Sequence, residues 1–399
     1  MRIVITADPY LPVPPTHYGG IERVIDLLVR GLVARGHEVT LVAHPASQTP
    51  ARLIAYGRPP HVGVRCRILE LAQAGRSLWR HRREIDVLHS FGRLAALLPI
   101  LASRRFPKIQ SYQRDGVPWR SIARARRLAG DTLLFTGCST SVYRLRPGGA
   151  EGGEWRTVFN GVDLSTYCCT PAVRPDAPLM FLGRVEAIKG THHAIAIARR
   201  AGRRLVIAGV TADSGPHAEY FADHVRPHID GRRVVFVGPV DDKQKNHWLG
   251  QAAALLMPIE WEEPFGIVMA EALACGTPIV GFRRGSVPEV IRDGINGFIC
   301  DDVDEAVRKI ASLDTLDRRA IRSDCEARFG AATIVDEYER LYIEMRARVD
   351  RPTRGLAGGR RGPAETAGLF EGSEVRLTPD TTTVRLSRDT TYGRARPHR

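Results

Sequence analysis

Two glutamates, Glu263 and Glu271, stand on either side of a turn that has the features of a ligand-binding loop. Pro264 and Gly266 bend the chain sharply before a helical pattern, so backbone amides are exposed at a helix N-terminus, where anionic or hydroxyl-rich groups bind. Glu271 lies one turn after Ile267, on the same side of the helix, and its carboxylate can accept two hydrogen bonds from a vicinal diol such as that of a ribose. Taken singly, each glutamate is also compatible with an ordinary residue of a helix or its N-terminus.

Two cations, Arg184 and Lys189, follow the apolar run that ends at Leu182. They stand in a loop at the carboxyl end of an expected strand, from which both can reach one diphosphate. Cations in such a place stabilise the charge that develops on a leaving phosphate. A pair of solvated surface cations is the alternative interpretation, and this segment alone does not exclude it.

A glycine pair, Gly19-Gly20, opens the first long helical pattern. Residues without side chains let a phosphate approach the amides of a helix N-terminus, although a plain turn would use them as well. Most histidines of the chain are expected to be structural or solvated. Two of them could face a cleft and contact an acceptor or a sugar, because His17 lies beside the glycine pair and His89 lies at the carboxyl end of a strand.

The elements that must position these residues begin with a strand, a helix and a strand. The strand Arg2 to Ala7 precedes a helix from Ile21 to Arg35, whose apolar residues recur at helical spacing, and a strand from Val39 to Ala43 follows. Such a βαβ unit predicts a parallel sheet. Further strands are expected at Val62 to Leu69, Val87 to Ser90, Lys108 to Tyr112, Thr132 to Gly137 and Thr157 to Phe159, with a helical stretch from Leu94 to Leu101.

The same alternation restarts after a proline-rich link at Pro171 to Pro178. Strands are expected there at Leu179 to Leu182, Leu205 to Ala208, Val234 to Val237, Ala253 to Met257, Pro278 to Val280 and Gly297 to Cys300. We therefore predict an α/β protein of two Rossmann-like domains, residues 1–165 and 166–330, that face a central cleft. A C-terminal helix is expected at residues 331–350. A disordered basic tail is expected at residues 351–399, where glycine, threonine, proline and arginine dominate.

The segment from Glu263 to Glu271, with Pro-Phe-Gly after the first glutamate, resembles the signature of the retaining glycosyltransferases of family 4. The loop from Gly183 to Gly190 is similar to the place where that family has Gly-Arg and then Lys-Gly. The segment from Tyr18 to Arg23 resembles its first-domain glycine loop, and Asn160 to Asp163 resembles its linker motif. The resemblance covers about residues 1–345 and implies a GT-B fold, in which the second Rossmann-like domain binds a nucleotide sugar.

The resemblance also implies a role for single residues. Glu263 and the amides of the next turn hold the transferred sugar, Glu271 holds the ribose, and the first-domain glycines close on the diphosphate. The catalytic residues are then Arg184, Lys189 and Glu263, and the donor-binding residues are Gly19, Gly20, Gly183, Gly238, Phe265, Gly266, Ile267 and Glu271. One position departs from the family, because Gln113 stands where many members have histidine. A glutamine can hydrogen-bond a sugar hydroxyl, but it cannot accept a proton at neutral pH.

Composition limits the remaining possibilities. A chain of 399 residues suits two domains, and no apolar run approaches the ~20 residues of a membrane span. The net charge of +14 suits a diphosphate donor, an anionic acceptor or an anionic membrane face, while no aromatic-basic motif indicates nucleic-acid binding. Seven cysteines without metal-type spacing indicate neither a disulfide framework nor a zinc site. We therefore expect a cytoplasmic protein, in peripheral contact with the inner membrane face at most.

The expected activity is transfer of a sugar from a nucleotide-diphosphate donor to a hydroxyl acceptor, a glycan, a lipid or a small molecule, with retained configuration. The donor phosphate would act as the base, and no cofactor or metal is expected, because no Asp-x-Asp motif is placed as metal-dependent transferases require. Three alternatives remain at this point. They are a non-catalytic nucleotide-sugar binder, another GT-B enzyme such as an epimerase or a phosphorylase, and a nucleic-acid binder acting through the tail.

Overall fold

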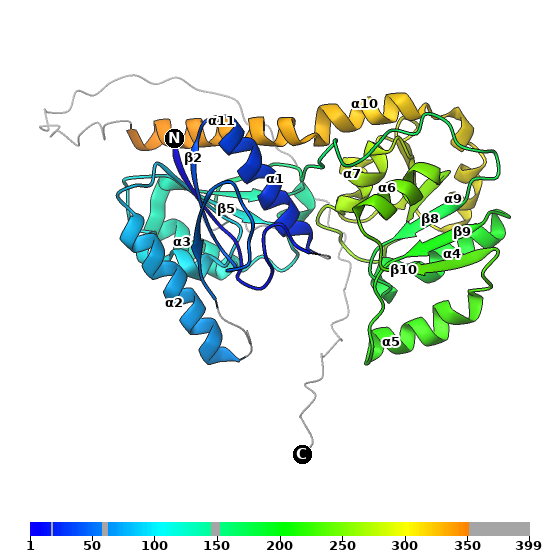
Figure 1. The fold of residues 1–399 in the computed structure, drawn as a ribbon, viewed down its shortest axis with the longest axis horizontal. Helices are drawn as coiled ribbons and strands as arrows, with labels where there is room; N and C mark the ends of the chain where they lie inside the picture. The colour runs from blue at the N-terminus through cyan, green and yellow to red at the C-terminus, as the bar shows by residue number, and fades with distance from the viewer. Residues whose placement is uncertain (17–18, 58–62, 145–151, 351–399) are drawn as a thin grey trace, which may run out of the picture. The chain divides into compact units, whose positions relative to one another are not determined.

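Two parallel sheets form the framework of the protein (Figure 1). The computed structural model describes residues 1–16, 19–57, 63–144 and 152–350, which belong to one compact unit. The first sheet has the strand order β3-β2-β1-β4-β5-β6-β7 and the second β10-β9-β8-β11-β12-β13. The strands are β1 Arg2–Thr6, β2 Glu38–Ala43, β3 Arg52–Ala55, β4 Val87–Ser90, β5 Lys108–Tyr112, β6 Leu133–Gly137, β7 Trp155–Thr157, β8 Leu179–Leu182, β9 Leu205–Ala208, β10 Val234–Gly238, β11 Ala254–Met257, β12 Ile279–Phe282 and β13 Gly297–Cys300.

Helices connect most of the parallel strands, as is usual for the crossovers of a parallel sheet, whereas β2 and β3 are joined by a loop. The α-helices are α1 Gly20–Ala34, α2 Val64–His81, α3 Trp119–Ala129, α4 Thr191–Arg200, α5 Pro216–Tyr220, α6 Asp242–Gln251, α7 Ile267–Ala274, α8 Val287–Val290, α9 Val303–Ile310, α10 Arg318–Phe329 and α11 Ala331–Asp350. Short 3-10 segments are η1 Leu94–Ile100, η2 Gly130–Thr132, η3 Thr140–Val142, η5 Ala187–Lys189, η7 Arg226–His228 and η8 Leu313–Thr315, and η6 Phe221–Val225 is a π-helical turn. No helix of the described residues is long and apolar enough to cross a membrane.

Both sheets reverse their strand order beside their first strand, between β1 and β4 and between β8 and β11. In open parallel sheets, ligands bind at the carboxyl ends of the strands where the order reverses. Asp8 follows β1 and Phe91 follows β4, while Gly183 follows β8 and Pro258 follows β11. The topology thus brings the segments that carry most of the predicted site residues to the two reversal points.

The predicted fold class, two parallel-sheet α/β domains, is confirmed, and five strands of the second half begin and end as predicted or within a residue. The strand predicted at Val62 to Leu69 is wrong, because Val64–His81 is the helix α2. Its apolar residues Val64, Ile68 and Leu69 misled the prediction, since they are 72%, 59% and 69% exposed, whereas the helix buries Glu70, Ala74, Gly75 and Leu78. The sequence pattern also missed the edge strand β3.

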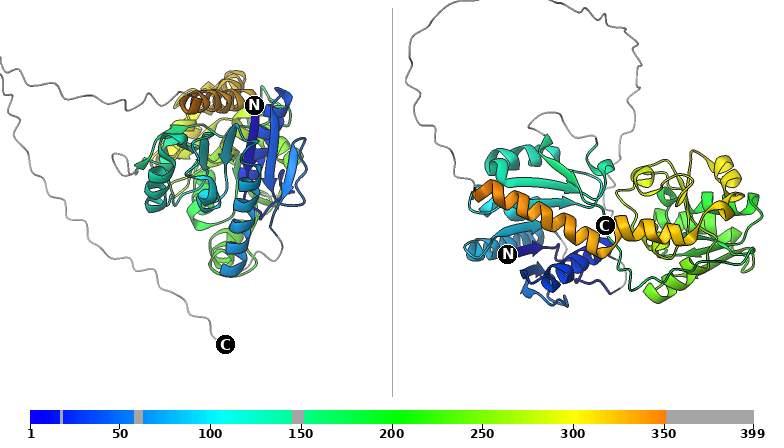
Figure 2. Two further views of the ribbon diagram at one scale, coloured as in Figure 1. Left: turned by 90° about the vertical axis from the view of Figure 1, so that its left-hand side faces the viewer. Right: turned by 90° about the horizontal axis from the view of Figure 1, so that it is seen from above.

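The last helix returns to the first sheet. Helix α11 begins at Ala331, as predicted, and lies beside α1 (Figures 1 and 2). Gly31 of α1 makes the contact close, because a Cβ atom there would lie 2.4 Å from Cγ2 of Val335. Tyr338 and Tyr342 of α11 are fully buried in the same cluster as the core of β1 and α1. Residues 351–399, predicted to be disordered, lie outside the described residues.

Candidate active site

The N-terminus of α1, in the first domain, lies against the N-terminus of α7, in the second. Gly266 precedes α7 with φ 69° and ψ 73°, a left-handed conformation that favours glycine and ends the turn after Pro264. A Cβ atom at Gly20, the first residue of α1, would lie 3.0 Å from Cδ1 of Ile267, the first residue of α7. Four predicted residues, Gly19, Gly20, Gly266 and Ile267, are therefore brought together with the free amides of two helix starts.

Glu263 and Lys189 form a close ion pair beside the start of α7. Lys189 Nζ donates to Glu263 Oε2 at 2.5 Å, and Trp261 Nε1 donates to the same oxygen at 3.1 Å. The ammonium group also lies 4.4 Å from the centre of the Trp261 ring. Glu263 is 8% exposed, so its carboxylate is held in one position by two donors. The sequence predicted both charged residues, but it did not identify Trp261.

The segment that carries Glu263 is fixed from two sides. Gly285 has φ +52°, and a Cβ atom there would lie 2.3 Å from the backbone nitrogen of Glu263. From the first half of the chain, Ser139 donates to the carbonyl oxygen of Pro264, and Ser141 Oγ donates to that of Glu263 at 3.3 Å. These serines follow β6, so the first domain positions the turn of the second.

Arg184 lies in the loop after β8 and is paired with Glu186. Its side chain is 39% exposed, and its Nε has no hydrogen-bond partner among the described residues. The guanidinium group therefore keeps donors available for a further anion. Gly183 precedes it, and a Cβ atom at the neighbouring Gly209 would lie 1.7 Å from the Gly183 carbonyl oxygen. Gly209, which sequence reasoning missed although it directly follows an expected strand, lets the ends of β8 and β9 lie this close.

Three glycines at the carboxyl ends of β8, β9 and β10, Gly183, Gly209 and Gly238, form a surface that we call the glycine floor. Gly183 donates its backbone N–H to the Ala208 carbonyl oxygen at 3.1 Å, and Gly209 donates to that of Gly238 at 2.8 Å. Gly238 has φ 74°, and a Cβ atom there would have no atom within 4 Å. The predicted residues Gly183 and Gly238 thus belong to one open surface without side chains, on which a flat ligand group can lie.

Glu271 is buried within α7 and is bound by two donors. Lys245 Nζ lies 2.5 Å and Tyr167 Oη 2.8 Å from Glu271 Oε1. Burial, together with the adjacent Glu271 carboxylate, raises the pKa of Tyr167, so this hydroxyl stays a donor. Neither Tyr167 nor Lys245 was identified from the sequence, because each lies far from Glu271 along the chain and in no motif. Both donors reach the same oxygen, Oε1, of the predicted diol-binding carboxylate.

The charges around Glu271 continue to the first domain. Lys245 Nζ lies 2.9 Å from Asp242 Oδ1, and Asp242 Oδ2 lies 2.6 Å from Arg23 Nη1 on α1. Burial opposes ionisation of Asp242, but hydrogen bonds from Lys245 and Arg23 outweigh it and hold the pKa of this carboxyl below its usual range. A row of alternating charges therefore connects α1 with the buried glutamate of α7.

A cavity of about 530 Å³ lies in the first domain, at the carboxyl ends of β1, β4 and β5. Its inner wall carries Asp8, Glu22 and Arg93, and Arg114 stands near both carboxylates. Burial raises the pKa of Asp8 and of Glu22. The predicted residue Gln113 also lines the cavity, and its Oε1 is buried without a hydrogen-bond partner among the described residues. Asp8, Glu22 and Arg93 were not identified from the sequence.

The prediction that His89 faces a cleft is wrong. The ring is fully buried beneath α11, where Nδ1 lies 2.7 Å from Tyr342 Oη and Nε2 lies 2.6 Å from Ser111 Oγ. Burial lowers its pKa to about 3, so the ring is neutral and serves the core. The sequence placed it at the end of a strand, but the side chain points to the face that α11 covers. His17, the other candidate, lies outside the described residues.

An Asp-x-Asp sequence follows β13, at Asp302 to Asp304, and both of its carboxylates interact with groups of α9 or α4. Asp302 caps the helix, because its side chain accepts from the backbone N–H of Glu305. Asp304 forms an ion pair with Arg200 of α4. Asp302 therefore serves as the N-cap of α9, and Asp304 connects α9 to α4.

Comparisons with known proteins match both halves of the chain. The model "Glycosyl transferases group 1" matches residues 174–326, and the model "Glycosyltransferase Family 4" matches residues 18–166. A glycogen synthase of Mycobacterium tuberculosis is 26% identical over 402 residues, which cover 86% of this chain and 94% of that protein. A D-inositol 3-phosphate glycosyltransferase of Catenulispora acidiphila is 32% identical over 252 residues, covering 55% of this chain and 58% of that protein.

Among solved structures, a glycosyltransferase involved in avilamycin A biosynthesis is 26% identical, with a TM-score of 0.63. The match covers 87% of this chain and 98% of that chain. The similarity therefore extends over both domains and over the segments that bring Gly20, Lys189, Glu263 and Glu271 together.

Proposed function

Since the chain belongs to the family 4 glycosyltransferases with the GT-B fold, we propose that it transfers a sugar from a nucleotide-diphosphate donor to a hydroxyl acceptor with retained configuration. One observation carries the proposal furthest. The start of α7 presents free amides beside the Lys189–Glu263 pair, opposite the start of α1. Donors and a carboxylate in this arrangement suit a diphosphate joined to a hydroxyl-rich ring.

In the proposed reaction, the bond between the anomeric carbon and the diphosphate oxygen breaks, and the acceptor oxygen forms a bond to that carbon from the same face. The acceptor proton passes to the departing diphosphate. Arg184 and Lys189 neutralise the negative charge that grows there, which is where preorganised cations accelerate a reaction most. Glu263 orients Lys189 and accepts from sugar hydroxyls. This route needs no proton acceptor at Gln113, which agrees with the chemistry of an amide.

The donor nucleotide is proposed to bind through Glu271 and the glycine floor. The carboxylate of Glu271 would accept the hydrogen bonds of the ribose diol, with Lys245 and Tyr167 holding it in place. The open surface at Gly183 and Gly238 leaves room for the diphosphate and the base. Thermal shift with UDP-, GDP-, ADP- and dTDP-sugars identifies the donor, since only a bound ligand raises the melting temperature.

The acceptor is proposed to bind in the first-domain cavity. Asp8, Glu22 and the unpartnered Oε1 of Gln113 are all hydrogen-bond acceptors, so they suit a group with several hydroxyls. A volume of about 530 Å³ admits one or two sugar-sized rings. A glycan, a lipid-linked glycan or a small molecule would then bind in the cavity through a hydroxyl-rich end, which faces the donor.

Product analysis tests the reaction itself. With the identified donor and an acceptor panel, we expect a glycoside whose anomeric configuration, measured by NMR, equals that of the donor. An epimerase would instead release the free nucleotide and an altered sugar without needing an acceptor. An inverted anomeric centre would contradict the proposal.

Two further experiments test the proposed source of charge neutralisation. Arg184→Ala and Lys189→Ala are each expected to lower turnover at saturating donor by about 100-fold or more. Transfer is expected to persist in EDTA, because protein cations and helix N-termini meet the phosphate charge. Unchanged turnover in both variants, or activity that EDTA abolishes and manganese restores, would overturn this assignment.

We propose that the protein works in the cytoplasm and touches an anionic membrane surface there. All seven cysteines are free thiols, which are stable in a reducing compartment. The exposed side of α2 combines large apolar residues with arginines, and α3 carries further arginines without an acidic residue. Helices of this composition bind the interface of anionic bilayers.

A further inference from the structure

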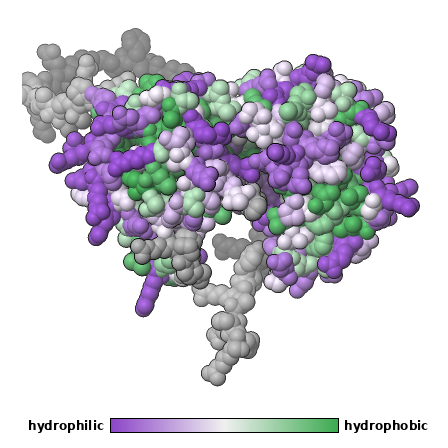
Figure 3. Space-filling view, viewed as in Figure 1, coloured by the Kyte–Doolittle hydropathy of each residue, from purple (hydrophilic) through white to green (hydrophobic). Residues whose placement is uncertain are grey.

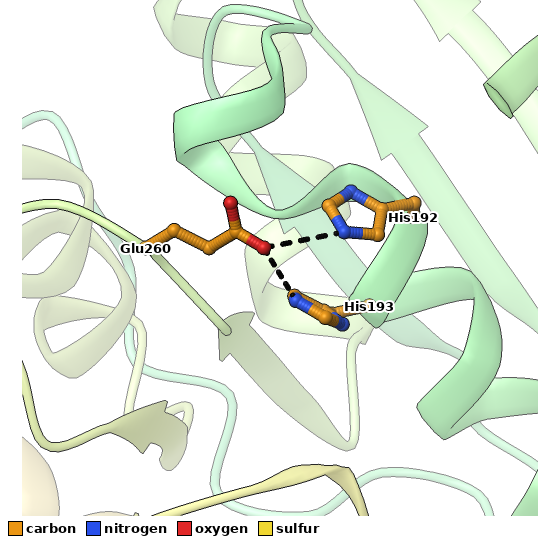
Figure 4. Close-up of side chains that lie close together, drawn as sticks. All are labelled: His192, His193 and Glu260. Atoms are coloured by element: carbon orange, nitrogen blue, oxygen red, sulfur yellow. Dashed lines mark hydrogen bonds and ion pairs between the residues drawn. The ribbon is translucent and has the colours of Figure 1, made fainter. Parts of the chain in front are cut away.

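A cluster of two imidazoles and one carboxylate lies on the second domain, outside the residues used above. His192 and His193 belong to the first turn of α4, and Glu260 belongs to the loop after β11. Their ligand atoms lie within 4.8 Å of one another. Figure 4 shows both rings directing a nitrogen at the same carboxylate. We propose that these three residues form a binding site for a zinc-class divalent cation, which clamps the two segments that carry Lys189 and Glu263.

The geometry of the cluster favours a cation over a plain hydrogen-bond network. Nε2 of His193 lies 2.7 Å from Glu260 Oε1, whereas Nε2 of His192 lies 3.4 Å from the same oxygen. Only the first is a good hydrogen-bond distance. A cation among the three atoms would bind all of them, after movements of flexible side chains that are 29% to 45% exposed.

A second contact prepares His192 as a ligand. Its Nδ1 lies 2.8 Å from Tyr220 Oη, and the backbone N–H of His192 donates to the same oxygen at 3.1 Å. When Nδ1 carries the proton and donates to Tyr220, the lone pair of Nε2 faces Glu260. A partner on the far nitrogen is what fixes the ring of a metal-bound histidine.

The donor set indicates which ion would bind. Two imidazoles and one carboxylate, with room for water at an exposed fourth position, are a ligand set of zinc, and nickel or cobalt also accept it. Magnesium and calcium prefer oxygen ligands. A third imidazole stands beside the cluster, because the ring centre of His224 lies 6.5 Å from that of His192.

The position of the cluster gives the ion a consequence for the active site. The backbone N–H of Glu260 donates to the Ile188 carbonyl oxygen at 2.9 Å. Gly190 allows this approach, since a Cβ atom there would lie 1.8 Å from the Pro258 carbonyl oxygen. Lys189 and Glu263 are carried by these same two segments. A cation between α4 and the loop after β11 would therefore restrain the ion pair without taking part in the reaction.

Calorimetric titration with zinc chloride as the probe tests the site. The full chain is first freed of metal with EDTA and gel-filtered. We expect one zinc ion per chain at micromolar dissociation constant or tighter, and visible absorption bands with cobalt. Glu260→Gln and His193→Ala are each expected to weaken zinc binding at least tenfold, while His228→Ala, at an exposed histidine outside the cluster, leaves it unchanged. Glu260→Gln keeps the size and the hydrogen-bond capacity of the side chain, so it retains the fold.

Hydrogen exchange provides the second measurement. Zinc is expected to raise protection at residues 188–191 and 260–263 in the unaltered chain and not in Glu260→Gln. The proposal is overturned if Glu260→Gln and His228→Ala bind zinc equally well. Binding at Cys168 and Cys169 would produce that result. The lack of saturable binding also overturns the proposal. Neither measurement uses sugar transfer, so the outcome is independent of the proposed function.

Discussion

At the scale of single residues, the predicted charged side chains are held in position by residues that lie outside the sequence motifs. Glu271 was predicted from its spacing to Glu263, but its position is fixed by Lys245 and Tyr167, which are remote in sequence. His89 shows the opposite case. Its place at the end of a strand suggested function, whereas both of its ring nitrogens are bonded in the core. Spacing within one segment was informative, but the direction of a side chain depended on the layer that covers it.

Replacing Lys245 tests the nucleotide site. In Lys245→Met, the buried carboxylate of Glu271 loses its cation and one of its two hydrogen-bond donors, so it is held less firmly in position to accept from a ribose diol. We expect the dissociation constant for the donor to rise at least tenfold, with little change in turnover at saturating donor. Lys243→Met, at an exposed position of the same helix, is the matched control. A lower melting temperature with unchanged donor affinity would mean that the ion pair only supports the fold.

The pH dependence of stability tests the burial of His89. Its pKa is about 3 in the folded protein against a usual value of 6.5, so between these values the unfolded chain binds a proton that the folded one does not. Stability from this group is complete above pH 6.5 and is lost as the pH falls, by up to about 1.4 kcal/mol per pH unit. Urea unfolding at pH 7 and pH 5 should show a smaller decrease for His89→Asn than for the unaltered chain. Equal decreases would show that the ring is accessible to protons.

At the scale of elements, the strands of the second half were predictable because they are short apolar runs between glycines and helices, and all of them except β10 are fully buried. The first half was harder. Helix α2 exposes the apolar residues Val64, Ile68 and Leu69 of its first turns, so the pattern of this part resembles that of a strand. Strand β3 is half-exposed at the sheet edge and has no distinct pattern. The packing of α11 on α1 could not be predicted either, since the sequence of a helix does not show which other helix it contacts.

The close approach of α1 and α11 can be tested by filling the space of Gly31. A Cβ atom there would lie 2.4 Å from Val335, so Gly31→Ala is expected to cost about 1–3 kcal/mol of unfolding free energy. Val335→Ala alone should also destabilise the protein, by leaving a cavity. The double variant should lose less than the sum of the two single losses, measured by urea unfolding. Strictly additive losses would mean that the two helices do not pack at this point.

At the scale of the whole molecule, charge is distributed unevenly over the elements. Of the net charge of +14, residues 351–399 contribute ten arginines against five acidic residues, and much of the rest lies in the first domain. On α2, Val64, Ile68 and Leu69 are exposed, whereas the single acidic residue, Glu70, is buried. Figure 3 shows hydrophilic side chains projecting from the half that holds α2, next to hydrophobic patches. An interface between water and an anionic bilayer satisfies both kinds of side chain.

Vesicle binding tests this surface. The full chain is expected to sediment with vesicles that contain anionic lipid, to bind neutral vesicles weakly, and to be released by high salt, because screening removes the attraction of arginines to the headgroups. The double variant Ile68→Ser, Leu69→Ser should bind anionic vesicles at least threefold more weakly, since it loses the apolar area that enters the interface. Ile343→Ser, at a 57% exposed isoleucine of α11, is the control and should bind normally. Equal loss in both variants would place the contact elsewhere, and binding that neutral vesicles share would exclude attraction by charge.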